Sequence, residues 1–89
     1  MIRRGRQAST AQTVTPGSWI YVPIPGDPWP IEMQIGPHPR RRAFIHREAD
    51  GSGGWQTLAA KRCPDLVPGT YTVKVYGAEE PIVTEITVI

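Results

Sequence analysis

The fold is determined by one stretch of the chain, Leu66-Val67-Pro68-Gly69-Thr70-Tyr71-Thr72-Val73-Lys74-Val75-Tyr76. The proline presets φ for the corner of a turn, and the glycine tolerates the positive φ that follows. Beyond this corner Tyr71, Val73 and Val75 alternate with polar residues, so they share one face of an extended segment. The stretch predicts a tight turn that leads directly into a strand with one buried face.

Alternating apolar residues predict further strands on both sides of this stretch. Turns rich in glycine and proline separate them, because these residues interrupt regular structure. The predicted strands cover residues 18–24, 31–35, 41–48, 55–60, 70–76 and 81–89, with residues 12–15 counted as an optional extra strand. In the strand over 41–48 two registers stay open, because either Phe44 or the pair Ala43 and Ile45 can face the core.

Prolines place the strand over 18–24 at the edge of a sheet. Pro23 and Pro25 are two residues apart, so the backbone donors that they lack fall on the same side of the strand. Only an edge strand tolerates that loss, and missing donors also discourage pairing with other chains.

The Leu66 to Val73 corner resembles the L-x-P-G-x-Y-x-V corner of immunoglobulin-like, fibronectin III-like and Cna-B-like domains. This resemblance and the run of short strands imply an all-β fold, an immunoglobulin-like β-sandwich of seven or eight short antiparallel strands. A jelly roll or a small barrel is the alternative. The expected core residues are Ile20, Val22, Trp55, Leu58, Leu66, Tyr71, Val73, Val75, Ile86 and Val88.

The chain length allows one domain and a short arm. Residues 18–89 form the sandwich, and residues 1–17, which hold almost no large apolar side chain, form an extended basic and polar arm. We expect the arm to become ordered on a partner surface, since polar segments of this kind order on binding. The single Cys63 excludes an internal disulfide and suits a small buried position, so self-association is the expected source of extra stability.

Charge is distributed unevenly along the sequence. Residues 1–47 carry seven arginines against two carboxylates, a net charge of +5, whereas residues 48–89 carry three basic residues against six acids, a net charge of −3. This asymmetry suits head-to-tail assembly or docking on an acidic surface, and equally the solvated face of a monomer. No run of apolar residues predicts a signal peptide or a membrane span.

The residues that perform catalysis or bind metals are scarce. Neither His38 nor His46 lies in a nucleophile motif, and one cysteine with two scattered histidines cannot complete a zinc site. A Cys63–His46 dyad is chemically conceivable, but a buried cysteine and a surface histidine account for both residues. The glycine-rich segment 50–54 lacks the ligands of a calcium loop and the lysine of a phosphate loop. We therefore expect no enzyme activity, no metal and no cofactor.

Arginine and exposed aromatic side chains point to binding instead. Arginine forks pair with phosphates or carboxylates, and aromatic rings offer flat contact surfaces. The candidate partner-binding residues are Arg3, Arg4, Arg6, Trp19, Tyr21, Trp29, Arg40, Arg41 and Arg42.

The hairpin sequence Asp50-Gly51-Ser52-Gly53-Gly54-Trp55-Gln56-Thr57-Leu58, followed by the proline-glycine corner, is similar to small β-sandwich virion proteins of tailed bacteriophages over residues 41–89. The similarity implies a capsid decoration or cement protein, located on the virion after synthesis in the host cytoplasm. Its partner would be the major capsid protein or another virion protein, bound through the arm and the face that carries Trp19 and Tyr21.

Three alternatives remain open from the sequence. The same architecture serves as a tail or fibre accessory protein. A carbohydrate or receptor-binding module would use Trp19, Trp29 and Tyr76 as its aromatic surface. A small nucleic-acid-binding β-barrel would combine the arginines with stacking rings, although the net charge of +2 is low for that function.

Overall fold

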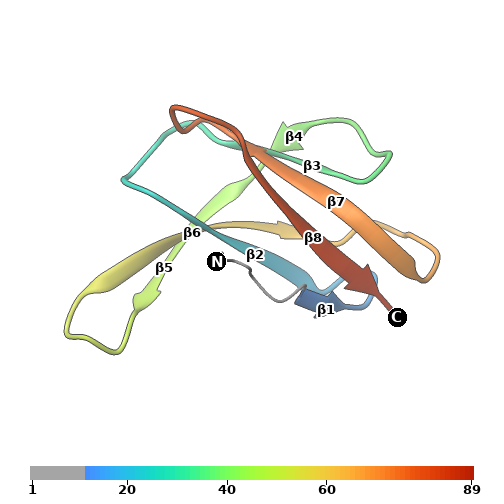
Figure 1. Cartoon of the computed structure of the whole chain (residues 1–89), viewed down its shortest axis with the longest axis horizontal. Coiled ribbons are helices and arrows are strands. Elements are labelled where there is room, and N and C mark those ends of the chain that lie inside the picture. Colours follow the sequence, from blue (N-terminus) through green and yellow to red (C-terminus); the bar gives the residue numbers. More distant parts are fainter. Residues whose placement is uncertain (1–11) are drawn as a thin grey trace, which may run out of the picture.

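Two β-sheets form the fold in the computed structural model, which describes residues 12–89 (Figure 1). The five-stranded sheet has the order β1-β8-β7-β3-β4, and the three-stranded sheet has the order β2-β6-β5. The strands are β1 (Gln12–Val14), β2 (Trp19–Ile24), β3 (Glu32–Ile35), β4 (Arg41–Arg42), β5 (Phe44–Ala49), β6 (Trp55–Arg62), β7 (Gly69–Tyr76) and β8 (Ile82–Val88). The prediction of an all-β sandwich of seven or eight strands is confirmed.

The space between the two sheets holds the core. Alternation directs every second residue of β2, β3, β7 and β8 inward, and residues 12–89 bury no charged or polar side chain. Leu66 and Tyr71 are half-buried and pack against this core. Of the expected core residues, Ile20, Val22, Leu58, Val73, Val75, Ile86 and Val88 are at most 5% exposed.

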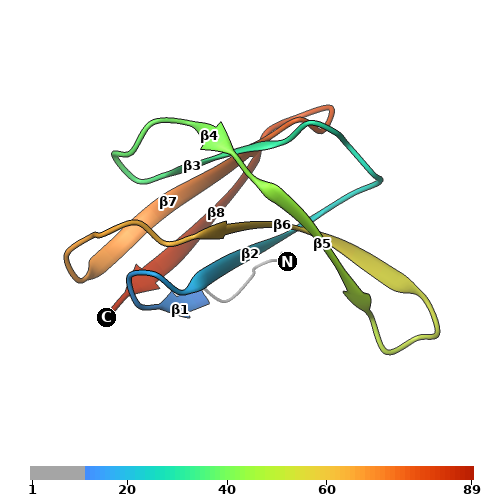
Figure 2. The same cartoon turned by 180° about the vertical axis from the view of Figure 1, so that it is seen from behind.

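The predicted strand over 41–48 divides into β4 and β5 where the chain crosses from one sheet to the other (Figure 2). Ala43 marks the crossing: its side chain is 1% exposed, and its N–H donates to the carbonyl of Ile31 at 3.0 Å. Ile45 packs against the core, whereas Phe44 points outward and is 64% exposed. The open register is therefore settled in favour of Ala43 and Ile45.

The first strand lies within the segment predicted to be an arm. β1 pairs in parallel with β8, and Val14 is buried in the core. The optional extra strand over 12–15 is therefore present as β1, and the sandwich includes residues from Gln12 onward and not only from residue 18. The expectation of purely antiparallel pairing is wrong for this one pair, because β1 and β8 run in the same direction along the sheet edge. Residues 1–11 lie outside the described part.

Trp55 was expected in the core but is 72% exposed. β6 is longer than β2: pairing with β2 reaches only Thr57, whereas Trp55 pairs with Ala49 of β5 alone. The end of the β5–β6 hairpin therefore extends past the body of the sandwich (Figure 1), where no opposing sheet covers the ring.

The turn of this hairpin is organised by Asp50. Its Oδ1 accepts hydrogen bonds from the hydroxyl and the N–H of Ser52, at 2.6 and 2.8 Å, and from the N–H of Gly54 at 3.3 Å. These bonds favour the ionised form, with the Ser52 hydroxyl as the largest cause, and lower the pKa of Asp50 below its ordinary value.

Tyr71 ties the turn before β7 to the sandwich. Its hydroxyl donates to the carbonyl of Val67 at 2.7 Å. The ring also packs against the loop after β3, where a Cβ on Gly36 would lie 2.8 Å from the ring atom Cδ1. Gly36 has a φ of 54°, so both the backbone conformation and the close ring favour glycine there.

Replacing Tyr71 with phenylalanine tests this corner. The Tyr71→Phe change keeps the ring but removes the hydrogen bond to Val67, so we expect the free energy of unfolding to fall by about 1 kcal/mol. Chemical denaturation measures it. Tyr76→Phe is the control, because the Tyr76 hydroxyl donates to a side chain, Gln34, at the longer distance of 3.3 Å and not to the backbone of a turn. An equal loss in both variants would contradict the role of the corner.

Asp50→Asn tests the hairpin turn through pH. Because the folded pKa of Asp50 lies below 3.8, the ionised carboxylate stabilises the fold above that pH, and the stabilisation is lost as the pH falls through the folded pKa. The unfolding midpoints of the wild type and the variant should therefore differ at pH 7 and converge toward about pH 2. A difference that stays constant over this range would refute the assignment.

Candidate interaction surface

Aromatic side chains gather on the outer face of the three-stranded sheet. The buried residues of β2 alternate with Trp19 and Tyr21, which therefore point away from the core. The outward residues of β5 are Phe44 and His46, which β6 separates from β2. The ring centroids of Trp19 and Phe44 lie 5.9 Å apart in an edge-to-face arrangement, and those of Tyr21 and His46 lie 5.2 Å apart. We call these four residues the aromatic face.

Two apolar residues of the central strand β6 lie beneath the two ring pairs. Ala60 of β6 pairs with both Tyr21 and Phe44, and Leu58 pairs with both Pro23 and His46. Leu58 and Ala60 are 5% and 4% exposed, yet neither belongs to the inter-sheet core. Leu58 is buried as expected, but its side chain lies on the outer side of the three-stranded sheet and not between the two sheets.

Polar groups border the aromatic face at both ends. At one end the Arg62 guanidinium lies 4.8 Å from the centroid of the Trp19 ring and donates to the carbonyl of Gly17 at 2.7 Å. At the other end Glu48 lies 3.3 Å from His46 Nε2 and accepts a hydrogen bond from Gln56 at 3.1 Å. An apolar centre with a polar border is the usual anatomy of a protein interaction surface.

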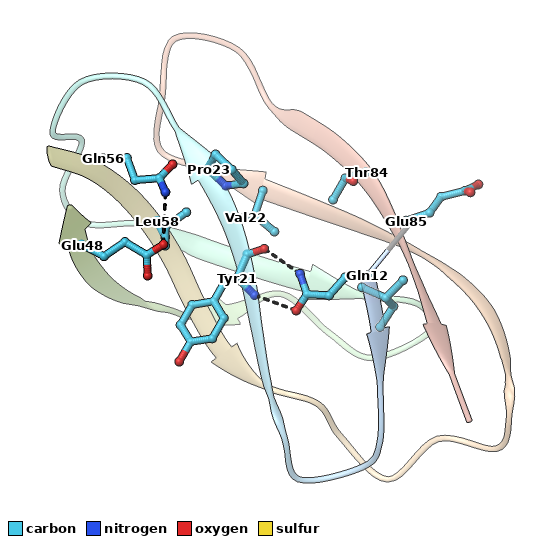
Figure 3. Close-up of a pocket in the computed structure, with 10 residues that line it drawn as sticks. Gln12, Tyr21, Val22, Pro23, Glu48, Gln56, Leu58, Thr84 and Glu85 are labelled. Carbon is cyan, nitrogen blue, oxygen red and sulfur yellow. Dashed lines mark hydrogen bonds between the residues drawn. The ribbon is translucent and has the colours of Figure 1, made fainter. Parts of the chain in front are cut away.

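The free edge of β2 is closed by a side chain (Figure 3). The Gln12 amide donates to the carbonyl of Tyr21 at 2.9 Å and accepts from its N–H at 3.2 Å. It therefore occupies the place of a neighbouring strand. Pro23 follows Tyr21 by two residues, so its backbone nitrogen faces the same free edge of β2, and a proline nitrogen has no N–H to donate. The prediction that this strand lies at a sheet edge is confirmed.

A hollow of about 360 Å³ runs along this edge between β2 and β8. In Figure 3, Gln12 lies beside Tyr21, between β2 and β8. Thr84 and Glu85 of β8 line one side of the hollow, and Glu48 and Gln56 line the other. The hollow therefore extends from Gln12, the first described residue, to Tyr21 of the aromatic face.

A second group of candidate residues lies on the five-stranded sheet. Arg40 Nε donates to Glu32 at 2.6 Å, and its guanidinium lies 4.0 Å from the centroid of the Tyr76 ring. The hydrogen bond to Glu32 is the largest cause that raises the pKa of Arg40. Arg42 lies 5.4 Å from the centroid of the Trp29 ring, which is 66% exposed. These arginines are already engaged within the chain.

The candidate partner-binding residues therefore do not form one surface. Trp19 and Tyr21 lie on the three-stranded sheet, the second group contains Trp29, Arg40 and Arg42, and Arg41 belongs to neither group. Arg3, Arg4 and Arg6 lie outside the described residues. The rings expected for carbohydrate binding are also divided, since Trp19 is on one sheet while Trp29 and Tyr76 are each stacked with an arginine of the other.

The chemical groups considered for catalysis lie apart. Cys63 is buried in the core, where its Sγ is 3.4 Å from the carbonyl of Pro64, and burial raises the pKa of the thiol. His46 belongs to the aromatic face, so the structure does not bring the two together. Among residues 12–89, no three His, Cys, Asp or Glu side chains are grouped so that they could hold a metal ion. The same residues contain no helix long and apolar enough to cross a membrane.

Comparisons with protein-family models, with curated proteins and with solved structures find no match.

Gln12→Met tests the closure of the β2 edge. Methionine keeps the length of the side chain but loses both hydrogen bonds to Tyr21, so the Tyr21 N–H should exchange with solvent about fivefold faster, as expected for the loss of ~1 kcal/mol. Hydrogen exchange followed by NMR measures it. Thr13→Ala, an exposed neighbour on β1, should leave the rate unchanged. An unchanged rate in Gln12→Met would show that the amide does not protect this edge.

Proposed function

We propose that this chain is a non-enzymatic structural protein, an immunoglobulin-like sandwich that attaches to a larger protein assembly through its aromatic face. The outward-facing cluster of Trp19, Tyr21, Phe44 and His46, in which Tyr21 and Phe44 are exposed and the other two half-buried, carries this proposal. Support for the immunoglobulin-like class comes from the strand order. A three-stranded sheet of the second, fifth and sixth strands faces a sheet in which the last strand lies between β1 and β7, and β3 follows β7. Tyr71 forms the corner hydrogen bond typical of such domains.

The aromatic face has the composition of an interface centre. Tryptophan, tyrosine and arginine are the side chains that most often dominate binding energy, and here Trp19, Tyr21 and Arg62 are neighbours. Phe44 is 64% exposed, a large apolar side chain whose burial by a partner is favourable. Because all these residues stand on paired strands, little backbone ordering is needed when a partner binds.

The N-terminal segment supports a second contact next to the first. The amide of Gln12 holds the backbone of Tyr21, so the preceding residues join the domain at the margin of the aromatic face. These residues include Arg3, Arg4 and Arg6 and contain no carboxylate. A partner with acidic groups beside an apolar patch would engage both elements.

The assembly we propose is the outer surface of a tailed-phage capsid, as the similarity of residues 41–89 implies. On such a lattice the chain would act as a decoration or cement protein, with the major capsid protein as its partner. Repeated weak contacts add to strong attachment on a lattice, because each bound element raises the effective concentration of the next.

Sedimentation with empty capsids, prepared without this chain from the virus that encodes it, tests the proposal. The Trp19→Ser/Phe44→Ser double variant should bind at least about tenfold more weakly, since it removes the centre of the face. Deleting residues 1–10 should also weaken binding. The matched control is Val67→Ser/Val83→Ser, which removes two exposed apolar side chains elsewhere and should bind like the wild type.

The proposal fails if the wild type does not bind the capsids, or if the two double variants bind equally well. Near-ultraviolet spectra and unfolding midpoints of all variants establish that each is folded. Weakened binding in the deletion alone would assign attachment to the arm and would contradict the role of the aromatic face.

A further inference from the structure

One end of the sandwich carries a hollow lined by positive charge. It lies where the loop between β3 and β4 approaches the segment that follows β6, and it has a volume of about 220 Å³. Met33 and Ile35 provide apolar walls. The polar lining consists of His38, Arg41, Lys61 and Arg62, which we call the cationic hollow.

Strand register explains why two of these cations meet. Arg41 pairs with Met33, which is fully buried, so its side chain starts on the core-facing side of the five-stranded sheet. Lys61 pairs with Ile20, also fully buried, and starts on the core-facing side of the other sheet. Two cations from opposite sheets therefore point into the same open margin between them.

No carboxylate balances these charges within the described part of the chain. The ion pairs of residues 12–89 involve Arg40, His46 and Arg47, and no Asp or Glu lines the hollow. Lys61 Nζ donates to the carbonyl of Arg42 at 3.2 Å, and Arg62 donates to that of Gly17, so both have neutral acceptors. Residues 1–11 contain no acidic residue that could supply the missing charge.

The positive charges in the hollow repel one another, and a bound anion would offset this repulsion. Arginine offers a planar fork of donors and lysine a mobile point charge with three donors, a combination that suits oxygen-rich anions. From this geometry we propose that the cationic hollow is a binding site for a multivalent oxyanion, a group of phosphate or carboxylate oxygens.

Charge at the opposite end of the sandwich supports this polarity. There the loops 25–31 and 77–81 lie together (Figure 1), and Asp27, Glu79 and Glu80 line a hollow between them. Asp27 is paired with Arg47 at 2.6 Å, so Glu79 and Glu80 supply most of the negative charge at this end. A field of this direction favours anions at the cationic hollow.

NMR titration of the full chain with sodium pyrophosphate, and separately with citrate, tests the site at low ionic strength. Saturating shifts should concentrate in the amide signals of the non-proline residues around the hollow, which are Gly36, His38, Arg40, Arg41, Lys61, Arg62 and Cys63. The Arg41→Gln/Lys61→Gln variant should bind about tenfold more weakly or worse, because two charge-assisted contacts are lost. A stronger response to pyrophosphate identifies phosphate as the recognised group, and a stronger response to citrate identifies carboxylate.

The matched control is Arg47→Gln/Lys74→Gln, which removes the same two residue types away from the hollow. This variant should bind both anions like the wild type. Equal weakening in the two double variants, shifts spread over the surface, or a response that does not saturate would overturn the proposal.

Thermal unfolding provides a second measurement. Pyrophosphate should raise the unfolding midpoint of the wild type, because a ligand that binds only the folded state stabilises it, and should leave that of Arg41→Gln/Lys61→Gln unchanged. Equal rises in both would also overturn the proposal.

Discussion

The interior between the two sheets accepts only apolar side chains among residues 12–89, and the placement of the remaining groups follows from this constraint. A domain of this size gains its stability mainly from that buried apolar surface. Burying an unpaired charge there would cost more free energy than a small core provides. Fully buried inward positions near the middle of the strands are therefore small or medium-sized apolar residues, such as Ile20, Met33, Ala59 and Val73. Arg41 and Lys61 occupy inward positions only because they stand at the open margin, where their charged groups reach solvent.

The alternation of the sequence predicts the faces of the strands well but not where the opposing sheet ends. Val73 and Val75 are buried as their pattern requires. Trp55 follows the same alternation as the rest of β6, yet it lies beyond the last residue of β2 and has nothing to pack against. Leu58 is covered by neighbours on the outer side of its own sheet. Both outcomes depend on strand lengths and cross-strand neighbours, which a local pattern does not contain.

The candidate interaction residues show the same limit. Arg40, Arg41 and Arg42 are consecutive, and consecutive strand residues alternate between faces, so the run could not form one patch once residue 41 begins a strand. The sequence contained that signal. It held no comparable signal for Phe44 and His46, which join Trp19 and Tyr21 only because β6 pairs with both β2 and β5. The aromatic face is a product of non-local pairing, and only the assembled sheet shows it.

The strand β1 connects the two sheets in a way that bears on attachment. Its backbone pairs with β8 in the five-stranded sheet, while the side chain of Gln12 holds the backbone of Tyr21 in the three-stranded sheet. Val14 adds a buried side chain to the core between them. A partner that binds the residues before β1 would therefore be connected to both sheets, at a point beside the aromatic face. Because the Gln12 amide and Pro23 leave little of the β2 edge free for strand pairing, recognition on this side must rely on side chains, which are specific to a partner in a way that backbone pairing is not.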